Sequence, residues 1–483
     1  MSAPELADLS AVELVAGYAK GRWTPREVAQ AVLARIDARE AVLNAMYRID
    51  HEGALAAAEQ ASARWQNKTP RSPVDGLPVT VKENLYTQGD PAPIGTAAGS
   101  LAPSAVDCPA AARLREAGCV ILGKTTMPDY GMLSSGLSSL HGITRNPWDP
   151  ALNPAGSSSG AGAAAAAGYG PWHLGTDIGG SIRLPAFHCG VFGLKPSLGR
   201  VPITPPYLGR AAGPMTRTVA DAALLMNVIA RRDAQDFMSL PPDDRDYTAG
   251  LEDLEPRSLR IGLLCDMGVG WPVEPDLAEA VREAARALES AGAVVEEMAS
   301  FMTPAMLDGI QAFFEARSFN DLQALDSARR GAVLPFIVEW ASWRARDFSG
   351  ARVIEAYNQL HAMREAAVRA SLGYDFVLSP VAPVARYLAE HACPGNDPHR
   401  ALDHIAFTVA WNMSEQPAAS VNWRADHAGL PVGVQIVGRR FDDAGVLRLA
   451  RMLEKLRPPQ WPWPQASRRV SVTARRIRLP ERC

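Results

Sequence analysis

Apolar and polar positions follow two different periods along the chain, and each period predicts one kind of element. Residues 1–70 carry apolar side chains at helical spacing, as at Val28 and Val32. Two Ser/Thr-x-x-Glu sequences, which start at Ser10 and Thr24, are typical of capping boxes at the beginnings of helices. The pattern therefore predicts a group of N-terminal helices.

Strand-like and helix-like stretches alternate after these helices. Apolar runs at 77–81 and 120–122 predict buried strands, and a helical pattern at 108–117 lies between them. The same order returns at 259–298, where strands are expected on both sides of a helix at 274–291. Because a helix between two strands is typical of a parallel pair, the order indicates an α/β fold.

The later part of the chain continues this pattern. Residues 304–372 look mostly helical, and strands are expected at 375–381 and 431–438 before a helix near 443–457. Aromatic residues in the helical stretch are expected to fill the core, and a substrate pocket is the alternative for them.

The composition excludes several classes of protein. Among 483 residues, 47% are hydrophobic and 21% charged, and the net charge of −3 gives no basic surface for nucleic acid. No run of about 20 apolar residues predicts a membrane-spanning helix. The six cysteines are widely spaced and form no ligand-like cluster. We therefore expect no metal site, and reduced thiols in a cytoplasmic protein.

The candidate chemistry lies in residues 153–196, which are rich in glycine and in specific polar residues. Ser157 and Ser181 each follow a glycine, where the backbone can turn sharply and a ligand can approach. In 175–181 (GTDIGGS), adjacent glycines leave backbone N–H groups unshielded, as a developing oxyanion requires. Because a nucleophile beside its own oxyanion loop suits acyl transfer, we rank Ser181 above Ser157 as the nucleophile.

The same stretch resembles the signature segment of the amidase signature family, most specifically in GGSIR at 179–183. That family uses a Ser–cis-Ser–Lys triad without histidine. The resemblance makes Ser181 the acylated nucleophile, Ser157 the bridging serine on a cis peptide bond, and Lys82 the base. It implies an amidase that cleaves a small-molecule amide into a carboxylate and ammonia or an amine, through proton transfer from Ser181 to Ser157 to Lys82.

The resemblance also implies the surroundings of the triad. It assigns the oxyanion hole to four backbone N–H groups, those of Ile178, Gly179, Gly180 and Ser181. It assigns substrate contacts to Met132 and Thr176, and it implies no cofactor. A homodimer stays open as the assembly.

Lys82 fits the role of base on physical grounds. A free lysine has a pKa of about 10.4, so it accepts protons at neutral pH only where desolvation or a nearby cation lowers that pKa. Lys82 ends the apolar run at 77–81, where it can be held away from water. The alternative is a lysine that extends from the strand end into solvent. The choice is narrow, because the chain has six lysines and 43 arginines, and arginine cannot be deprotonated.

Three other motif matches compete with this interpretation. GxxxxGK[ST] at 118–125 contains apolar, β-prone residues where a phosphate-binding loop needs an open turn. GxGxxA at 160–165 follows no predicted strand. GxSxG at 156–160 would make Ser158 the nucleophile of an α/β-hydrolase-like esterase, but three prolines in 146–154 disfavour the strand that such a turn must follow.

The resemblance covers residues 5–225 well and 375–457 more loosely. It implies an α/β fold in a single large domain, with a mixed twisted β-sheet covered by α-helices on both sides. The expected parts are N-terminal helices at 1–70, a catalytic core at 75–225, a variable substrate-side region at 230–400 and closing strands and a helix at 401–464, all within an amidase signature domain at 1–464. The arginine-rich tail at 465–483 resembles nothing in the family and is expected to be a flexible or partner-contacting end.

Two positions depart from the family pattern, and one alternative function remains. Ser159 stands where a glycine is commonest and Thr126 where an asparagine is usual, which affects the expected substrate contacts. The family also includes amidotransferase subunits that pass ammonia to a charged tRNA. Residues 300–395 show no characteristic arginine motif for a glutamine carboxylate. Apolar residues in the variable region favour a neutral, hydrophobic substrate group.

Overall fold

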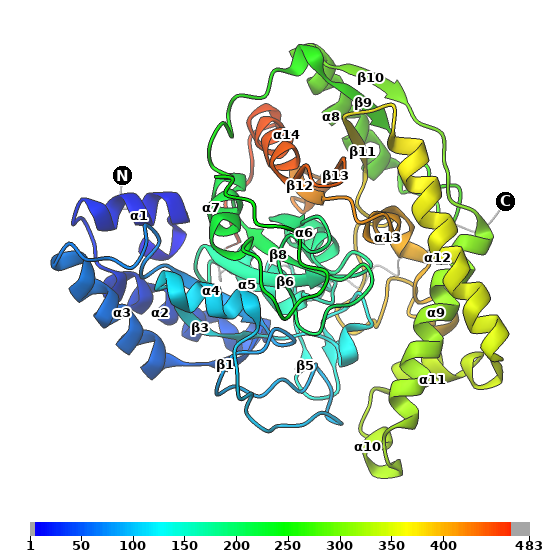
Figure 1. Cartoon of the computed structure of the whole chain (residues 1–483), viewed down its shortest axis with the longest axis horizontal. Coiled ribbons are helices and arrows are strands. Elements are labelled where there is room, and N and C mark those ends of the chain that lie inside the picture. The colour runs from blue at the N-terminus through cyan, green and yellow to red at the C-terminus, as the bar shows by residue number, and fades with distance from the viewer. Residues whose placement is uncertain (1–4, 465–483) are drawn as a thin grey trace.

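A mixed β-sheet of eleven strands runs through the middle of the molecule (Figure 1). The computed structural model describes residues 5–464, so the arginine-rich tail lies outside the described part. Across the sheet, the strands follow the order β1-β3-β2-β6-β8-β7-β12-β13-β11-β9-β10. Their bounds are β1 Met46–Ile49, β2 Pro78–Lys82, β3 Val120–Thr125, β6 Trp172–Asp177, β7 Phe192–Lys195, β8 Ala211–Thr216, β9 Arg260–Leu263, β10 Val294–Glu297, β11 Phe376–Pro380, β12 Ala418–Ala425 and β13 Pro431–Gly438.

Parallel and antiparallel pairs share this sheet. β3, β2 and β6 are parallel neighbours, as are β11, β9 and β10. The pairs between β6 and β11 are antiparallel, and so is the edge pair of β1 and β3. Helices flank the sheet, which confirms the expected α/β fold with one mixed sheet in a single domain.

The N-terminal helices form as expected. They are α1 Ala11–Ala19, α2 Pro25–Leu43 and α3 His51–Gln66, and both predicted capping boxes are present at the starts of α1 and α2. The region also contains β1, which the sequence pattern did not predict. This strand is short and only partly buried, so it has too few residues to show an alternating pattern.

The first βαβ unit positions the later site. β2 leads through α4 Pro109–Ala117 into β3, and the two strands pair in parallel. The phosphate-loop match at 118–125 is therefore part of a buried strand, and Lys124 Nζ donates to the backbone oxygen of Leu85 rather than facing an open loop. The alanine run forms α5 Ser159–Ala167, whose residues are all buried because their small side chains allow close packing.

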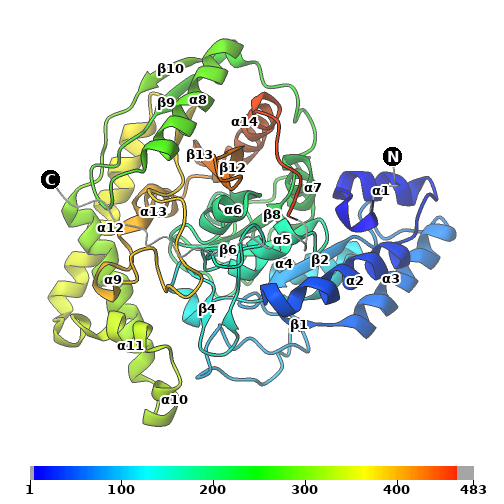
Figure 2. The same ribbon diagram turned by 180° about the vertical axis from the view of Figure 1, so that it is seen from behind.

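The remaining helices pack against the sheet or against one another. α6 Arg183–Cys189, α7 Val219–Ile229, α8 Pro275–Ala291, α13 Ala406–Met413 and α14 Asp443–Leu456 lie close to the strands. α9 Pro304–Gln323, α10 Ser327–Gly331, α11 Pro335–Ser342 and α12 Gly350–Ser371 lie at the end of the molecule opposite α1–α3 (Figure 2). A small hairpin, β4 Leu137–Ser138 and β5 Gly142–Ile143, stands apart from the main sheet. Within residues 5–464, no helix combines the length and the hydropathy needed to cross a membrane.

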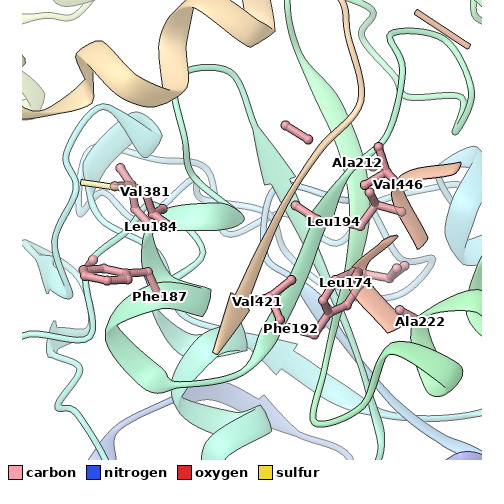
Figure 3. Close-up of a cluster of buried hydrophobic side chains, with 14 of the residues drawn as sticks. Leu174, Leu184, Phe187, Phe192, Leu194, Ala212, Ala222, Val381, Val421 and Val446 are labelled. Carbon is pink, nitrogen blue, oxygen red and sulfur yellow. The ribbon is translucent and has the colours of Figure 1, made fainter. Parts of the chain in front are cut away.

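The core joins the early and late parts of the chain. Figure 3 shows Leu174 of β6, Leu194 of β7 and Ala212 of β8 with Val421 of β12 and Val446 of α14 in one buried cluster. Because β7 pairs directly with β12, the first and second halves of the chain share the centre of the sheet. This arrangement places residues from both parts around the end of β6.

Candidate active site

The candidate site lies where two parallel strands end. Lys82 is the last residue of β2, and Thr176 and Asp177 end β6, its parallel neighbour. Ser157 lies two residues before α5, and Ser181 lies in the loop between β6 and α6. Because the carboxyl ends of parallel strands meet at one edge of a sheet, these residues gather there.

Lys82 is fully buried among hydroxyl groups. Its Nζ lies 2.9 Å from Ser157 Oγ, 3.0 Å from Ser158 Oγ and 3.0 Å from Thr176 Oγ1. Burial holds the pKa of Lys82 well below its ordinary value, and the nearby positive charge of Arg210 lowers it further. The site therefore favours a neutral amine that can accept a proton.

The two neighbouring serines differ in what their hydroxyl protons do. Ser158 Oγ donates to the backbone oxygen of Thr176 at 3.1 Å and accepts from the Thr176 N–H at 3.2 Å. Within residues 5–464, Ser157 Oγ has no hydrogen-bond partner apart from Lys82 Nζ. The hydroxyl proton of Ser157 is thus free to point toward Lys82, whereas that of Ser158 is engaged.

The peptide bond between Gly156 and Ser157 is cis. A side chain at position 156 would not fit, because a Cβ there would lie 2.5 Å from the backbone oxygen of Ser135 and 2.6 Å from its nitrogen. The turn is linked to the loop after β6 by a hydrogen bond from the Ser158 N–H to the Ser181 oxygen at 3.1 Å. The two serine-bearing segments are therefore held against each other.

The loop after β6 offers three backbone donors. The N–H groups of Ile178, Gly179 and Ser181 have no acceptor in the described part of the chain. The N–H of Gly180 differs from the expectation, because it donates to Asp177 Oδ1 at 2.8 Å. The Asp177 side chain turns back into its own loop and occupies this fourth donor.

A buried ion pair supports this loop. The Arg183 guanidinium donates to both carboxylate oxygens of Asp177, with Nη2 2.9 Å from Oδ1 and Nε 3.0 Å from Oδ2. Burial by itself raises the pKa of the Asp177 carboxyl, but the charge and hydrogen bonds of Arg183 outweigh it and hold that pKa below its ordinary value. The loop therefore carries a permanent carboxylate that fixes its own backbone.

Residues far along the chain complete this support, and sequence reasoning did not find them. Asn412 of α13 donates to Asp177 Oδ1 at 2.8 Å and accepts from Arg183. Thr408, one turn earlier, donates to the backbone oxygen of Gly179 at 2.6 Å. The available signal was the spacing of two polar residues, four apart, in the otherwise apolar segment AFTVAWNM.

A pocket of about 180 Å³ opens onto these groups. Ser157, Ser181, Met132 and Thr176 all line it, so every side chain proposed from the sequence except the buried base faces one space. Thr176 is at the same time a direct hydrogen-bond partner of Lys82. The pocket lining within residues 5–464 includes no histidine.

Ser158 does not fit the alternative role of esterase nucleophile. It is fully buried, it is absent from the pocket lining, and residues 153–157 directly before it form no strand. The aromatic residues of the helical region also lie elsewhere: Phe314 and Trp340 are buried in the core, as their main interpretation predicts.

Two other buried lysines show that burial alone does not select a base. Burial lowers the pKa of Lys124 to about 8 and that of Lys195 to about 7. Their amines donate to backbone oxygens, those of Leu85 and Pro196, and neither lysine lines the pocket. Lys82 is distinguished by its contact with a pocket serine.

The chain matches known proteins over most of its length. The family model described as Amidase matches residues 27–447. One subunit of the glutamyl-tRNA(Gln) amidotransferase of Myxococcus xanthus is 36% identical, over 93% of this chain and 98% of that protein. The corresponding protein of Chloroflexus aurantiacus is 34% identical, over 94% of this chain and 97% of its own length.

Solved structures show the same fold. A bacterial aryl acylamidase of the amidase signature family superposes with a TM-score of 0.85 at 28% identity, covering 93% of this chain and 96% of its own. A 6-aminohexanoate cyclic dimer hydrolase superposes with a TM-score of 0.85 at 27% identity, covering 96% and 99% of the two chains. The peptide amidase of Stenotrophomonas maltophilia has a TM-score of 0.80 at 26% identity, covering 95% and 98%. The chain therefore belongs to the amidase signature family and is an amidohydrolase.

Proposed function

We propose that the protein hydrolyses a carboxylic amide through an acyl-enzyme on Ser181. Neutral Lys82 takes the proton of Ser157, and Ser157 takes that of Ser181 as its Oγ attacks the amide carbonyl. The proton then returns along the same path to the leaving ammonia or amine, and water hydrolyses the ester. The observation that carries this proposal is the buried Lys82 amine 2.9 Å from the Oγ of Ser157, which shares a pocket with Ser181.

The negative charge that develops on the carbonyl oxygen during attack needs hydrogen-bond donors in place before the reaction. The N–H groups of Ile178, Gly179 and Ser181 are the candidates, since they have no acceptor within residues 5–464. Gly180 is left out of this proposal because its N–H is held by Asp177. Its role is to let the loop adopt a φ of 125°, which side-chain-bearing residues rarely reach.

We expect one hydrogen bond of the relay, between Ser157 and Ser181, to form only when substrate is bound. In the described part of the chain, no hydrogen bond joins Ser157 Oγ to Ser181 Oγ. Catalytic hydrogen bonds often tighten when substrate binds, so we expect the Ser181 hydroxyl to turn toward Ser157 in the complex.

Covalent labelling tests the proposal directly. A neutral fluorophosphonate should add one adduct per chain, which peptide mapping places on Ser181. Ser181→Ala should abolish the adduct, and Lys82→Ala should slow its formation by at least about 100-fold. Ser290→Ala and Lys455→Ala, at exposed positions, serve as matched controls and should label normally. An adduct on Ser158, or full-rate labelling of Lys82→Ala, would contradict the mechanism.

A second candidate function rests on the names of the relatives. Both curated relatives described above are subunits of a glutamyl-tRNA(Gln) amidotransferase. If this chain acts in that way, the purified chain should release ammonia from glutamine only when partner subunits are added. An independent amidase should turn over its amide as the isolated chain, so an ammonia assay with and without partner subunits separates the two candidates.

A further inference from the structure

We propose that the pocket binds an amide that carries a second, anionic group, a carboxylate held by Arg210 and Arg317. This inference rests on the proposed amidase function and adds the substrate class. It departs from the neutral, hydrophobic group that the apolar residues of the variable region led us to expect. The evidence is that both guanidinium groups line the pocket beside Ser181.

Arg210 reaches the pocket because of the strand order. It directly precedes β8, whose first residue, Ala211, pairs with Asp177 at the end of β6. Its Nη1 donates to the backbone oxygen of Pro205 at 3.1 Å. No carboxylate oxygen of residues 5–464 lies within 4.0 Å of its guanidinium. Burial, together with the charge of Arg317, lowers the pKa of Arg210 to about 10.

Arg317 comes from a different part of the chain. It lies on α9, and its guanidinium carbon stands 4.3 Å from the centre of the Tyr207 ring. It also has no carboxylate oxygen within 4.0 Å in the described chain. Stacking on an aromatic ring leaves the edge of a guanidinium free to donate hydrogen bonds in its plane.

An arginine that packs against the same helix has acidic partners. Arg344, which also faces α9, pairs with Asp308 at 2.7 Å and with Glu315 at 2.8 Å. Two partly enclosed cations without acidic partners are costly unless a ligand supplies the anion. Carboxylate is the group whose two oxygens match the fork of a guanidinium.

The acidic groups of the pocket do not cancel this charge. Asp177 is already paired with Arg183. Asp321, one turn after Arg317 on α9, is exposed and forms no ion pair within 4.0 Å in residues 5–464. Burial of part of its side chain raises the pKa of Asp321, and the charge of Arg317 opposes that rise. The lining therefore keeps an excess of positive charge.

The carboxylate could belong to either side of the amide, and paired substrates distinguish the two. Succinamate against butyramide places the charge on the acyl side. N-butyrylglycine against N-propylbutyramide places it on the amine side. We expect the charged member of one pair to have a kcat/KM at least about tenfold higher, with the advantage shrinking as salt is added.

Arginine variants test which residues carry the preference. Arg317→Gln should remove most of the advantage of the charged substrate, because kcat/KM should fall far more for that substrate than for its neutral partner. Arg369→Gln, an exposed arginine that does not line the pocket, is the matched control and should keep the advantage. Equal loss for charged and neutral substrates in Arg317→Gln would indicate a structural role and overturn the proposal.

Binding without turnover separates this inference from the proposed mechanism. Succinate and N-butyrylglycine should bind to the Ser181→Ala variant by calorimetry, at least one of them more tightly than butyramide and less tightly after Arg317→Gln. If fluorophosphonate labelling succeeds and neither anion binds better than butyramide, the substrate class is wrong and the amidase proposal stands. If labelling fails and an anion binds more tightly than butyramide, the Ser181 mechanism is wrong and the anion-binding site stands.

Discussion

At the scale of single residues, the proposed chemistry depends on an amine that loses its proton more readily than a lysine in water does. Burial is the main cause and the Arg210 guanidinium adds to it, whereas the carboxylates of Asp177 and Glu83 act in the opposite direction. Nearby hydroxyls keep hydrogen bonds to Lys82 Nζ after the proton is gone. Lys82 can therefore be buried without a carboxylate partner.

Replacement of this amine by a group that stays charged should stop the reaction. Lys82→Arg should lower kcat/KM by at least about 100-fold, because a guanidinium does not release its proton at the pH of the assay. Steady-state kinetics over a pH series provide the measurement. An active Lys82→Arg enzyme would contradict a role for Lys82 as base, provided that circular dichroism shows the variant to be folded.

The pH dependence of kcat/KM should reveal the effect of the Arg210 charge on the pKa of Lys82. The neutral amine becomes populated as the pH rises through the pKa of Lys82, so kcat/KM should increase with pH along the acidic limb. Arg210→Met removes a positive charge, so the pKa of Lys82 should rise and this limb should move to higher pH. The substrate should be a neutral amide, because a charged one would also lose its contact with Arg210. The control Arg369→Gln should leave the acidic limb of kcat/KM at its original pH. An unchanged limb in Arg210→Met would show that its charge does not act on Lys82.

At the scale of elements, the loop after β6 is positioned by α13. Asn412→Ala removes a donor from Asp177 and an acceptor from Arg183, so the buried ion pair loses part of its support. We expect the free energy of unfolding to fall by about 1–3 kcal/mol in urea titrations. We also expect kcat to fall more than KM changes, since the oxyanion donors shift. Asn320→Ala, on an exposed position of α9, is the control.

The contact between α1 and α7 should make stability depend on pH. Asp221 in the first turn of α7 accepts from the Val12 N–H of α1, and burial raises the pKa of its carboxyl from 3.8 to about 7. The folded state therefore holds a proton that the unfolded chain releases, and the stability from this group is lost as pH rises toward 7.

Asp221→Asn should show this effect by removing it. The variant cannot ionise. Its free energy of unfolding minus that of the original chain should therefore be more positive at pH 8 than at pH 5, which means that the variant gains relative stability at the higher pH. Urea titrations at the two pH values provide the comparison. Asp244→Asn, at an exposed position, should show no such difference. A constant difference for Asp221→Asn at both pH values would contradict the assignment.

The elements that could be predicted are those with long local patterns. The strands β2 and β3 contain continuous apolar runs, and the helix between them and the helices α8 and α14 show clear apolar periodicity. By contrast, β8 (AAGPMT) contains glycine and proline and few β-prone residues. It is a strand because β6 and β7 pair with it on either side. Such tertiary pairing leaves no signal in the segment itself.

The same distinction applies to the site. Lys82, Ser157 and Ser181 could be proposed because local sequence marks each one. Arg317 could not, since only the packing of α9 beside the loop at 203–210 brings it to the pocket. The hydrogen bond from the Gly180 N–H to Asp177 could not be predicted from the sequence either, because it depends on the rotamer of the Asp177 side chain.

At the scale of the whole molecule, the strand order ties the two ends of the chain into one cooperative structure. Leu194 of β7 is fully buried in the core shared with β12 and α14. Leu194→Ala should lower the free energy of unfolding by about 2–5 kcal/mol and shift the fluorescence and activity transitions together. Val294→Ala, at a half-exposed edge position, should have a much smaller effect. Separate transitions for fluorescence and activity would show that the two parts unfold independently.

Differences in burial also divide the lysines into two sets that differ in their reactivity toward reagents in solution. Lys20, Lys68 and Lys455 are exposed, whereas Lys82, Lys124 and Lys195 have almost no accessible surface. An amine-acylating reagent applied to the folded protein will therefore modify the first set and leave the proposed base untouched. Chemical inactivation, the traditional way to reveal an essential lysine, will miss a base that is buried in this way.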